Sequence, residues 1–208
     1  MHTRLPKQRT SWQQGVIVLL LSGLTACSQL SLPLPAAKAV SPPASVATPL
    51  PLPLSAVQQQ QFAQAKTLLS GADYNGATAL LQALAAELPQ APGIGYNLAL
   101  SQWQSGDIAG AQQSLQQVVS VAPQYSDAHN LLGVLARQQG NFRQAERHFQ
   151  RALQANSDYA TAHKNLAFLY ELYLGEPLQA HYHYQQYYAL TQDEQAKGWL
   201  ALLEQQLA

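Results

Sequence analysis

Charged residues and cysteine are scarce in this chain of 208 residues. Lys, Arg, Asp and Glu together make up 11% of the sequence, and 11 cations balance 11 acids. Without an excess of cations, the chain lacks the electrostatic footprint with which proteins hold nucleic acid. The lone cysteine, Cys27, excludes an internal disulfide, a Cys-based zinc site and an iron–sulfur cluster.

Sequence motifs of catalysis are missing as well. There is no Gly-rich phosphate loop, no nucleophile elbow, no HExxH and no paired-carboxylate motif. An enzyme would need a catalytic group among scattered residues such as His129 and His163, so we expect a protein that is not an enzyme and that takes no cofactor. We also expect no metal site, because His181 and His183 would point about 200° apart on a helix.

The first 27 residues have the three parts of an export signal. Arg4, Lys7 and Arg9 precede the short apolar run 16–21, and the segment ends in Leu-Thr-Ala-Cys at positions 24–27. A basic start, an apolar centre and a small-residue end are typical of a secretory signal, and the run is shorter than the ~20 residues that span a bilayer. Residues 1–26 are therefore predicted to be a signal peptide, although an ordinary signal with a chance cysteine, or an uncleaved anchor, fits the pattern too.

Residues 24–27 resemble the bacterial lipobox. The resemblance implies cleavage before Cys27, a lipid on its thiol and an acyl chain such as palmitate on the new amino group. Two or more chains hold a protein durably, since each buried methylene contributes about 0.8 kcal/mol. Ser28, where retention signals have Asp, implies by the same resemblance a protein on the outer membrane that faces the periplasm.

Proline dominates the next segment, residues 27–57. Seven prolines lie here, with Lys38 as the only charge. Such a segment favours extended polyproline geometry, at about 3.1 Å per residue, and does not form a helix. We expect a flexible linker that tethers the following domain to the membrane.

From Gln58 onward the chain repeats every 34 residues, in the blocks 58–91, 92–125, 126–159 and 160–193. The eighth position of each block is always small: Ala65, Ala99, Gly133 and Ala167. So is the twentieth: Ala77, Ala111, Ala145 and Ala180. The last of these comes one residue late, which predicts an insertion in the turn Leu174–Pro177. Small residues at two fixed positions let two helices cross closely, and larger apolar residues fill the space around them: Leu81, Leu115, Phe149 and Tyr184.

This pattern resembles the tetratricopeptide repeat (TPR), whose period is 34. The resemblance implies an all-α, right-handed solenoid of about four helix-turn-helix repeats. Residues 194–208 read as a capping helix, with a dimerisation helix as the alternative. The consensus Trp at the fourth position of a repeat is replaced throughout, by Gln61, Gly95, His129 and His163.

In TPR proteins the first helix of each repeat lines a concave groove that binds partners. Transferred to this chain, the groove positions are Phe62, Lys66, Tyr96, Leu100, Trp103, Asn130, Val134, Arg137, Lys164 and Phe168. Leu100 and Phe168 can equally pack against neighbouring repeats. The cations are too few for a clamp on a peptide carboxylate. A separate stripe, Arg143, Arg147 and Arg151, predicts either a solvated face or a contact for an acidic partner or lipid headgroups.

The pattern as a whole predicts an outer-membrane lipoprotein that binds proteins, with no nucleic acid and no small-molecule substrate as partner. It is similar to TPR lipoproteins that serve type IV pilus biogenesis and secretin assembly, which implies a role in building an envelope machine such as a pilus or a secretion system. An adaptor that recruits peptidoglycan-remodelling enzymes and a self-associating structural lipoprotein are the alternatives.

Overall fold

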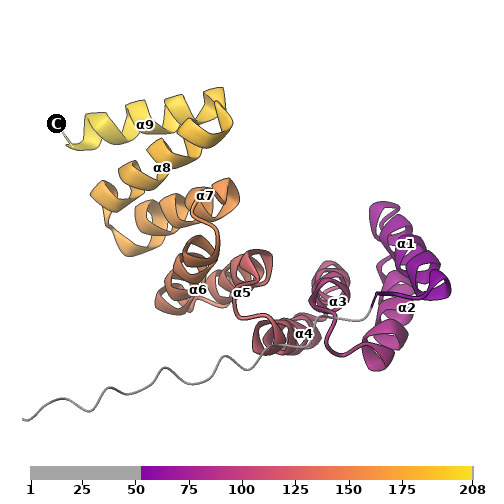
Figure 1. The fold of residues 1–208 in the computed structure, drawn as a ribbon. Helices are drawn as coiled ribbons and strands as arrows, with labels where there is room; N and C mark the ends of the chain where they lie inside the picture. Colours follow the sequence, from indigo (N-terminus) through magenta and orange to yellow (C-terminus); the bar gives the residue numbers. More distant parts are fainter. Residues whose placement is uncertain (1–52, 208) are drawn as a thin grey trace, which may run out of the picture. The chain divides into compact units, whose positions relative to one another are not determined.

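The computed structural model describes residues 53–207, and its regular elements there are helices (Figure 1). They follow one another as α1 (Ala56–Ser70), α2 (Tyr74–Glu87), α3 (Pro92–Gln104), α4 (Ile108–Val121), α5 (Ser126–Gln138), α6 (Phe142–Ala155), α7 (Ala160–Leu169), the π-helical turn η1 (Tyr170–Leu174), α8 (Pro177–Thr191) and α9 (Glu194–Leu207). Each odd-numbered helix up to α7 packs on the even-numbered helix that follows it, so the helices form four hairpins.

The predicted signal peptide 1–26, Cys27 and nearly all of the linker 27–57 lie outside the described residues. Helix α1 begins at Ala56, two residues before the first predicted block. Its start is fixed by a capping box, in which the Ser55 side chain accepts from the Gln58 amide and the Gln58 side chain accepts from the Ser55 amide. None of the described helices is long and apolar enough to cross a membrane.

The turn inside each hairpin is made by one residue with a left-handed backbone. Ala72, Gly106, Gly140 and Gly175 occupy this place, with φ of 59°, 91°, 77° and 65°. In the first turn the amide of Ala72 donates to the Leu69 carbonyl and that of Asp73 to Leu68, which is the Schellman arrangement that satisfies the last carbonyls of a helix. Asp73 and Asp107 then cap the next helix through their side chains, whereas Asn141 and Glu176 make no side-chain cap bond.

The inserted residue of the fourth block lies in η1 and not in the turn Leu174–Pro177, where the sequence placed it. In the three earlier turns the amide after the left-handed residue donates to a carbonyl five residues back, but Glu176 donates to Tyr170, six residues back. A π-helical turn takes up one extra residue in this way without moving the helices on either side. The turn itself keeps the geometry of the others, because Gly175 remains left-handed.

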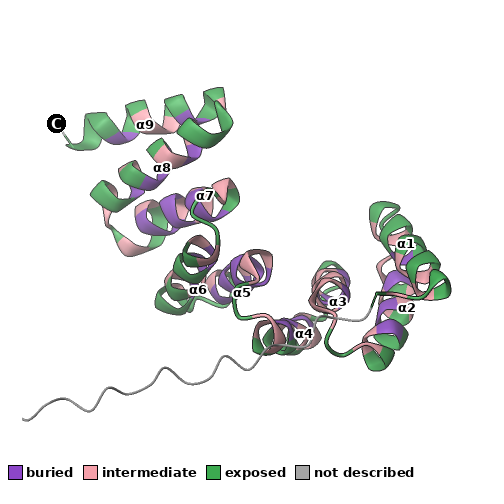
Figure 2. Ribbon diagram, viewed as in Figure 1, coloured by how far each residue is buried: buried purple, intermediate pink, exposed green. Residues whose placement is uncertain are grey.

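The small residues of the repeat mark the places where helices cross. Ala65, Ala99, Ala167 and all four alanines at the twentieth position have no exposed surface. A Cβ built on Gly133 would lie 2.5 Å from the ring of Phe149, which is itself completely buried. The helices therefore touch one another along their buried sides (Figure 2), which confirms the all-α repeat architecture expected from the sequence.

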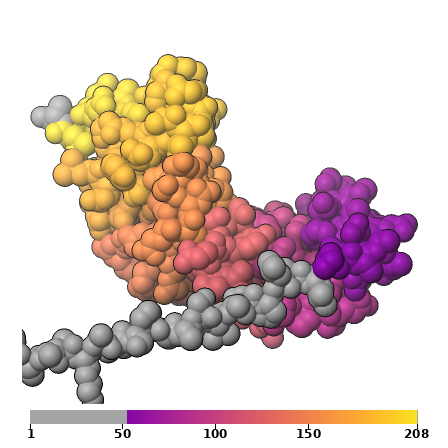
Figure 3. All heavy atoms as spheres, in the orientation of Figure 1, coloured from indigo at the N-terminus to yellow at the C-terminus, as the bar shows by residue number. Residues whose placement is uncertain are grey.

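Helix α9 closes the C-terminal end of the hairpins. Ala196 and Leu203 are fully buried, and Trp199 and Leu200 pack against the core formed by α5 to α8. In the space-filling view α7, α8 and α9, orange to yellow, make one continuous mass (Figure 3). The outer side of α9 faces solvent, where Leu202 and Leu207 are exposed.

Candidate protein-binding groove

The first helices of successive hairpins meet directly. Helix α1 contacts α3 and α5 contacts α7. Hydrogen bonds join them as well: the Trp103 indole N–H donates to Gln138 Oε1 at 3.3 Å, and Asn165 Nδ2 donates to Asn130 Oδ1 at 2.8 Å. This row of first helices is the face on which the predicted groove residues stand, and we call it the groove.

Three tyrosines surround one carboxylate at the edge of the groove. The Tyr159 hydroxyl donates to Asp127 Oδ1 at 2.6 Å, and the rings of Tyr96 and Tyr125 lie 5.6 Å apart. Burial, with the negative charge of Asp127 and the neighbouring Tyr125, raises the pKa of Tyr96 to about 12. Burial and the bond to Asp127 raise the pKa of Tyr159 further. All three phenols therefore stay neutral, so the cluster offers hydroxyls and one carboxylate to a partner.

Sequence reasoning placed Tyr96 in the groove but missed Tyr125 and Tyr159. Both close a 34-residue block, one at the end of the second and one at the end of the third. Their recurrence at the same position was a signal that could have found them. Their joint approach to Asp127 depends on how α3, α5 and α7 stack, which the repeat period does not specify.

Cations of the predicted groove lie over aromatic rings. Lys66 Nζ is 5.2 Å from the centre of the Phe62 ring, and Lys164 Nζ is 5.1 Å from that of Tyr187. A cation over a ring face is held there by the quadrupole of the ring, by roughly 0.5–1 kcal/mol at exposed sites. Arg137 is half-buried in the last turn of α5.

Several predicted groove residues also serve the packing of the hairpins. Phe168 meets the rings of Tyr184 and Trp199 edge-on at 5.6 and 5.1 Å, so it contacts the core around α8 and α9. Leu100 packs with Trp103 against the core of the second and third hairpins. Val134 packs against this core and also against the core around α7 and α8. Asn130 is 9% exposed and holds Asn165, which leaves little of it accessible to a partner.

Histidines at the fourth and twenty-third positions pair inside the third and fourth hairpins. His163 Nδ1 and His183 Nδ1 are 2.9 Å apart, and His129 lies on His148 with the ring centres 6.0 Å apart. His163 Nε2 donates to the Ser157 carbonyl, so its Nδ1 accepts and His183 donates. Burial lowers the pKa of His183 to about 4, with the facing His163 as the second cause. Within residues 53–207, no three His, Cys, Asp or Glu side chains gather as metal ligands would.

The arginine stripe of α6 is exposed along its length. Arg143 donates to Glu146 at 2.9 Å and to Glu176 at 2.8 Å, and these bonds raise the pKa of its guanidinium. Arg151 lies at the rim of a hollow beside His129. The stripe faces away from the groove, since α6 is a second helix of its hairpin.

Comparison with known proteins agrees with this architecture. A tetratricopeptide-repeat family model matches residues 96–160 and 132–172. Among solved structures, a thermophilic TPR protein of Thermus thermophilus, TTC0263, is 25% identical over 73% of this chain and 83% of its own, with a TM-score of 0.59. Pseudomonas aeruginosa pilF is 15% identical, with coverages of 70% and 67% and a TM-score of 0.64. No curated protein matches the chain significantly.

A third similar structure was solved with a bound peptide. It is the first TPR of Spaghetti (RPAP3) bound to an HSP90 peptide, 15% identical over 55% of this chain and 90% of its own, with a TM-score of 0.52. The described residues thus have the all-α TPR fold, a scaffold suited to protein–protein interaction. Proteins with this fold are generally interaction scaffolds without catalytic activity.

Proposed function

We propose that the groove binds a segment of a partner protein and that a lipid on Cys27 holds the scaffold at the outer membrane. The observation that carries the proposal is the cluster of Tyr96, Tyr125, Tyr159 and Asp127, which is assembled from α3 and the starts of α5 and α7 and is preset by a 2.6 Å hydrogen bond. Preset polar and aromatic side chains lose little entropy on binding, and this is what gives such surfaces their affinity.

The charges of the groove favour a partner segment with charges of both signs. Asp127 accepts one bond from Tyr159 and has a second carboxylate oxygen for an amide or a cation of the partner. Arg137, at the other end of α5, and Lys164, on α7 of the next hairpin, suit an acidic group. An extended or helical segment that lies across α5 and α7 would meet both regions.

The partner we propose is a component of an envelope machine such as a type IV pilus or a secretion system, in whose assembly the protein would act at the periplasmic side of the outer membrane. The proposal rests on the lipobox-like end of the first 27 residues and on the likeness of the repeats to TPR lipoproteins that help secretin rings to form. The similarity in fold to Pseudomonas aeruginosa pilF supports it.

Site-specific crosslinking in cells tests the groove. A photo-crosslinking residue at Arg137 is expected to capture a secretin subunit, whereas the same residue at Gln116, exposed on α4 outside the groove, should not. Asp127→Asn should reduce the yield at Arg137 several-fold, because the amide keeps the shape of the carboxylate and removes its charge. Equal capture from both positions, or capture that ignores Asp127→Asn, would count against the groove.

Anchoring and assembly are tested separately. Cys27→Ala is expected to release the protein from outer-membrane fractions, and deletion of the gene to reduce secretin multimers. Normal secretin multimers and normal piliation in the deletion strain would refute the proposed role in this machine. The proposal that the groove binds a partner would not be affected. If the Cys27→Ala protein stays in the membrane fraction, the proposal of a lipid anchor on Cys27 is refuted.

A further inference from the structure

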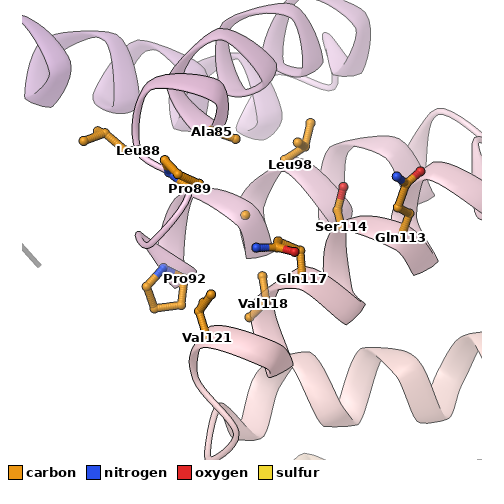
Figure 4. Close-up of a pocket in the computed structure, with 11 residues that line it drawn as sticks. Ala85, Leu88, Pro89, Pro92, Leu98, Gln113, Ser114, Gln117, Val118 and Val121 are labelled. Atoms are coloured by element: carbon orange, nitrogen blue, oxygen red, sulfur yellow. The ribbon is translucent and has the colours of Figure 1, made fainter. Parts of the chain in front are cut away.

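A hollow of about 380 Å³ opens between the first and second hairpins, beyond the groove (Figure 4). Its walls come from the end of α2, the start of α3 and one side of α4. The walls are largely apolar, with Leu88, Pro89, Pro92, Val118 and Val121 around the opening seen in Figure 4. None of its lining residues carries a charge.

The same place in the third hairpin is partly filled by the chain itself. A smaller hollow of about 270 Å³ lies there, and four of its six lining residues stand 34 positions after residues that line the first. Pro123 stands where Pro89 stands, Arg151 where Gln117 stands, and His129 where Gly95 stands. His129 is 5% exposed, and its Nε2 donates to the Pro123 carbonyl at 2.9 Å.

In the fourth hairpin this place holds two rings in contact. His163 and His183 occupy the fourth and twenty-third positions, with ring centres 5.1 Å apart, and both are buried. The twenty-third position is His148 in the third hairpin and Ser114 in the second. Two successive hairpins therefore place a flat ring where the second hairpin has Gly95 and Ser114, and the hollow is what the missing rings leave.

The second hairpin has adapted to the absence of the ring only in part. A Cβ on Gly95 would lie 2.8 Å from Val118 Cγ2. A methyl of Val118 therefore takes up space beside the position that His129 holds one hairpin later, where the smaller Ala152 stands in place of the valine. A valine methyl is far smaller than an imidazole, and the hollow remains. Ser114 lines the hollow with its hydroxyl already engaged, because the hydroxyl donates to Gln102 Oε1 at 2.7 Å.

We propose that this hollow binds an uncharged aromatic side chain of a partner protein. The apolar walls stabilise a ring by burial, and the absence of charge excludes an ionised group, which would lose its hydration and find no counter-charge. Gln113 and Gln117 at the rim offer amides to the main chain on either side of the ring. The site is a second contact outside the groove, so it stands or falls independently of the groove's partner.

The test uses N-acetyl-tryptophanamide as the probe and amide NMR shifts of the full chain as the readout. We expect saturable shifts at Gly95, Ser114 and Val118 with a Kd on the order of 1 mM, as befits a ligand of this size. N-acetyl-alaninamide, which has no ring, should leave these amides unmoved. If n-octanol shifts the same amides at a lower concentration than the tryptophan probe does, the hollow is a site for an acyl chain and the proposal is overturned.

Two variants fill the hollow in different ways. Ala85→Met sends a flexible side chain into it, and Ala86→Met is the matched control because Ala86 is exposed on the same helix outside the lining. We expect Ala85→Met to raise the Kd of the probe at least about tenfold and Ala86→Met to leave the Kd unchanged.

The second variant, Gly95→His with Ser114→His and Val118→Ala, copies the third hairpin and should abolish binding. Because those residues already pack together in the third hairpin, it keeps the proposal testable if Ala85→Met perturbs the fold. Circular dichroism verifies that each variant is folded. Probe shifts that persist in both filled variants, or that never saturate in the native chain, would refute the site.

Discussion

Ala72 is the one hairpin-turn residue that takes a left-handed backbone with a Cβ, and exchanging it with its neighbour should stabilise the protein. The three equivalent turns have glycine there. In the first hairpin the glycine comes one residue early, as Gly71, where φ is −85° and glycine is not needed. The double substitution Gly71→Ala with Ala72→Gly restores the order found in the other turns and leaves the composition unchanged.

The magnitude follows from two terms. A left-handed L-residue costs roughly 1–2 kcal/mol, and the exchange removes that cost at position 72. The unfolded-state entropy of glycine, about 0.4–1 kcal/mol, is gained at one position and lost at the other, so it cancels. A Cβ on Gly71 would meet the carbonyls of Thr67 and Leu68 at 3.5 and 3.6 Å, which is ordinary contact. The expected gain is therefore about 1–2 kcal/mol.

Urea unfolding of the full chain measures the gain, and a rise of roughly 2–8 °C in Tm should accompany it. Because hairpins at the end of a solenoid can open alone, amide exchange in α1 locates the effect in the first hairpin. Gly140→Ala is the reverse control: it places a Cβ at φ 77° with no atom within 4 Å, so strain alone should destabilise it. An exchange variant with unchanged or lower stability would refute the reasoning.

Three further predictions concern the hairpins. Burial lowers the pKa of His148 and His183 to about 4. Since the unfolded imidazoles titrate near 6.5, stability is complete above about pH 6.5 and is lost toward pH 4, by at most about 3 kcal/mol for the buried His183 and by less for His148, whose partial exposure screens the charge; urea unfolding across that range measures the loss. Gly133→Ala should destabilise by about 2 kcal/mol because its Cβ would meet a buried ring, whereas Gly198→Ala, with open space in α9, should stabilise by up to about 1 kcal/mol; thermal unfolding with the same sign for both would contradict this. Asp107→Ala removes the cap bond to the Gly110 amide and should cost about 1 kcal/mol in the same assay.

Much of the fold was readable because the period is local information. Alanine or glycine at the eighth and twentieth positions predicts where two helices cross, and every one of these residues is buried at a crossing. The insertion in the fourth block was equally visible, but not its place. A turn and a π-helical bulge absorb one residue equally well in sequence terms, and the backbone bond from Glu176 to Tyr170 is what distinguishes them.

The candidate groove was less predictable, because a position in the repeat says which face a residue is on and not what it touches. Phe168 is at a groove position of the repeat, yet its ring makes edge-to-face contacts with the rings of Tyr184 and Trp199. Asn130 is turned to Asn165 of the next hairpin. Such contacts depend on the rotation between hairpins, which many weak side-chain contacts determine together.

By itself the sequence determined the helical hairpins, their number and the small residues that let them pack, since period, volume and turn chemistry are properties of the chain. Tertiary structure alone decided which side chains converge across hairpins. It gathers three tyrosines on Asp127, pairs His163 with His183, and leaves a hollow at Gly95 where the third and fourth hairpins place a ring. A missing side chain is a cavity only when the surrounding walls do not close on it, and their position is a property of the folded stack.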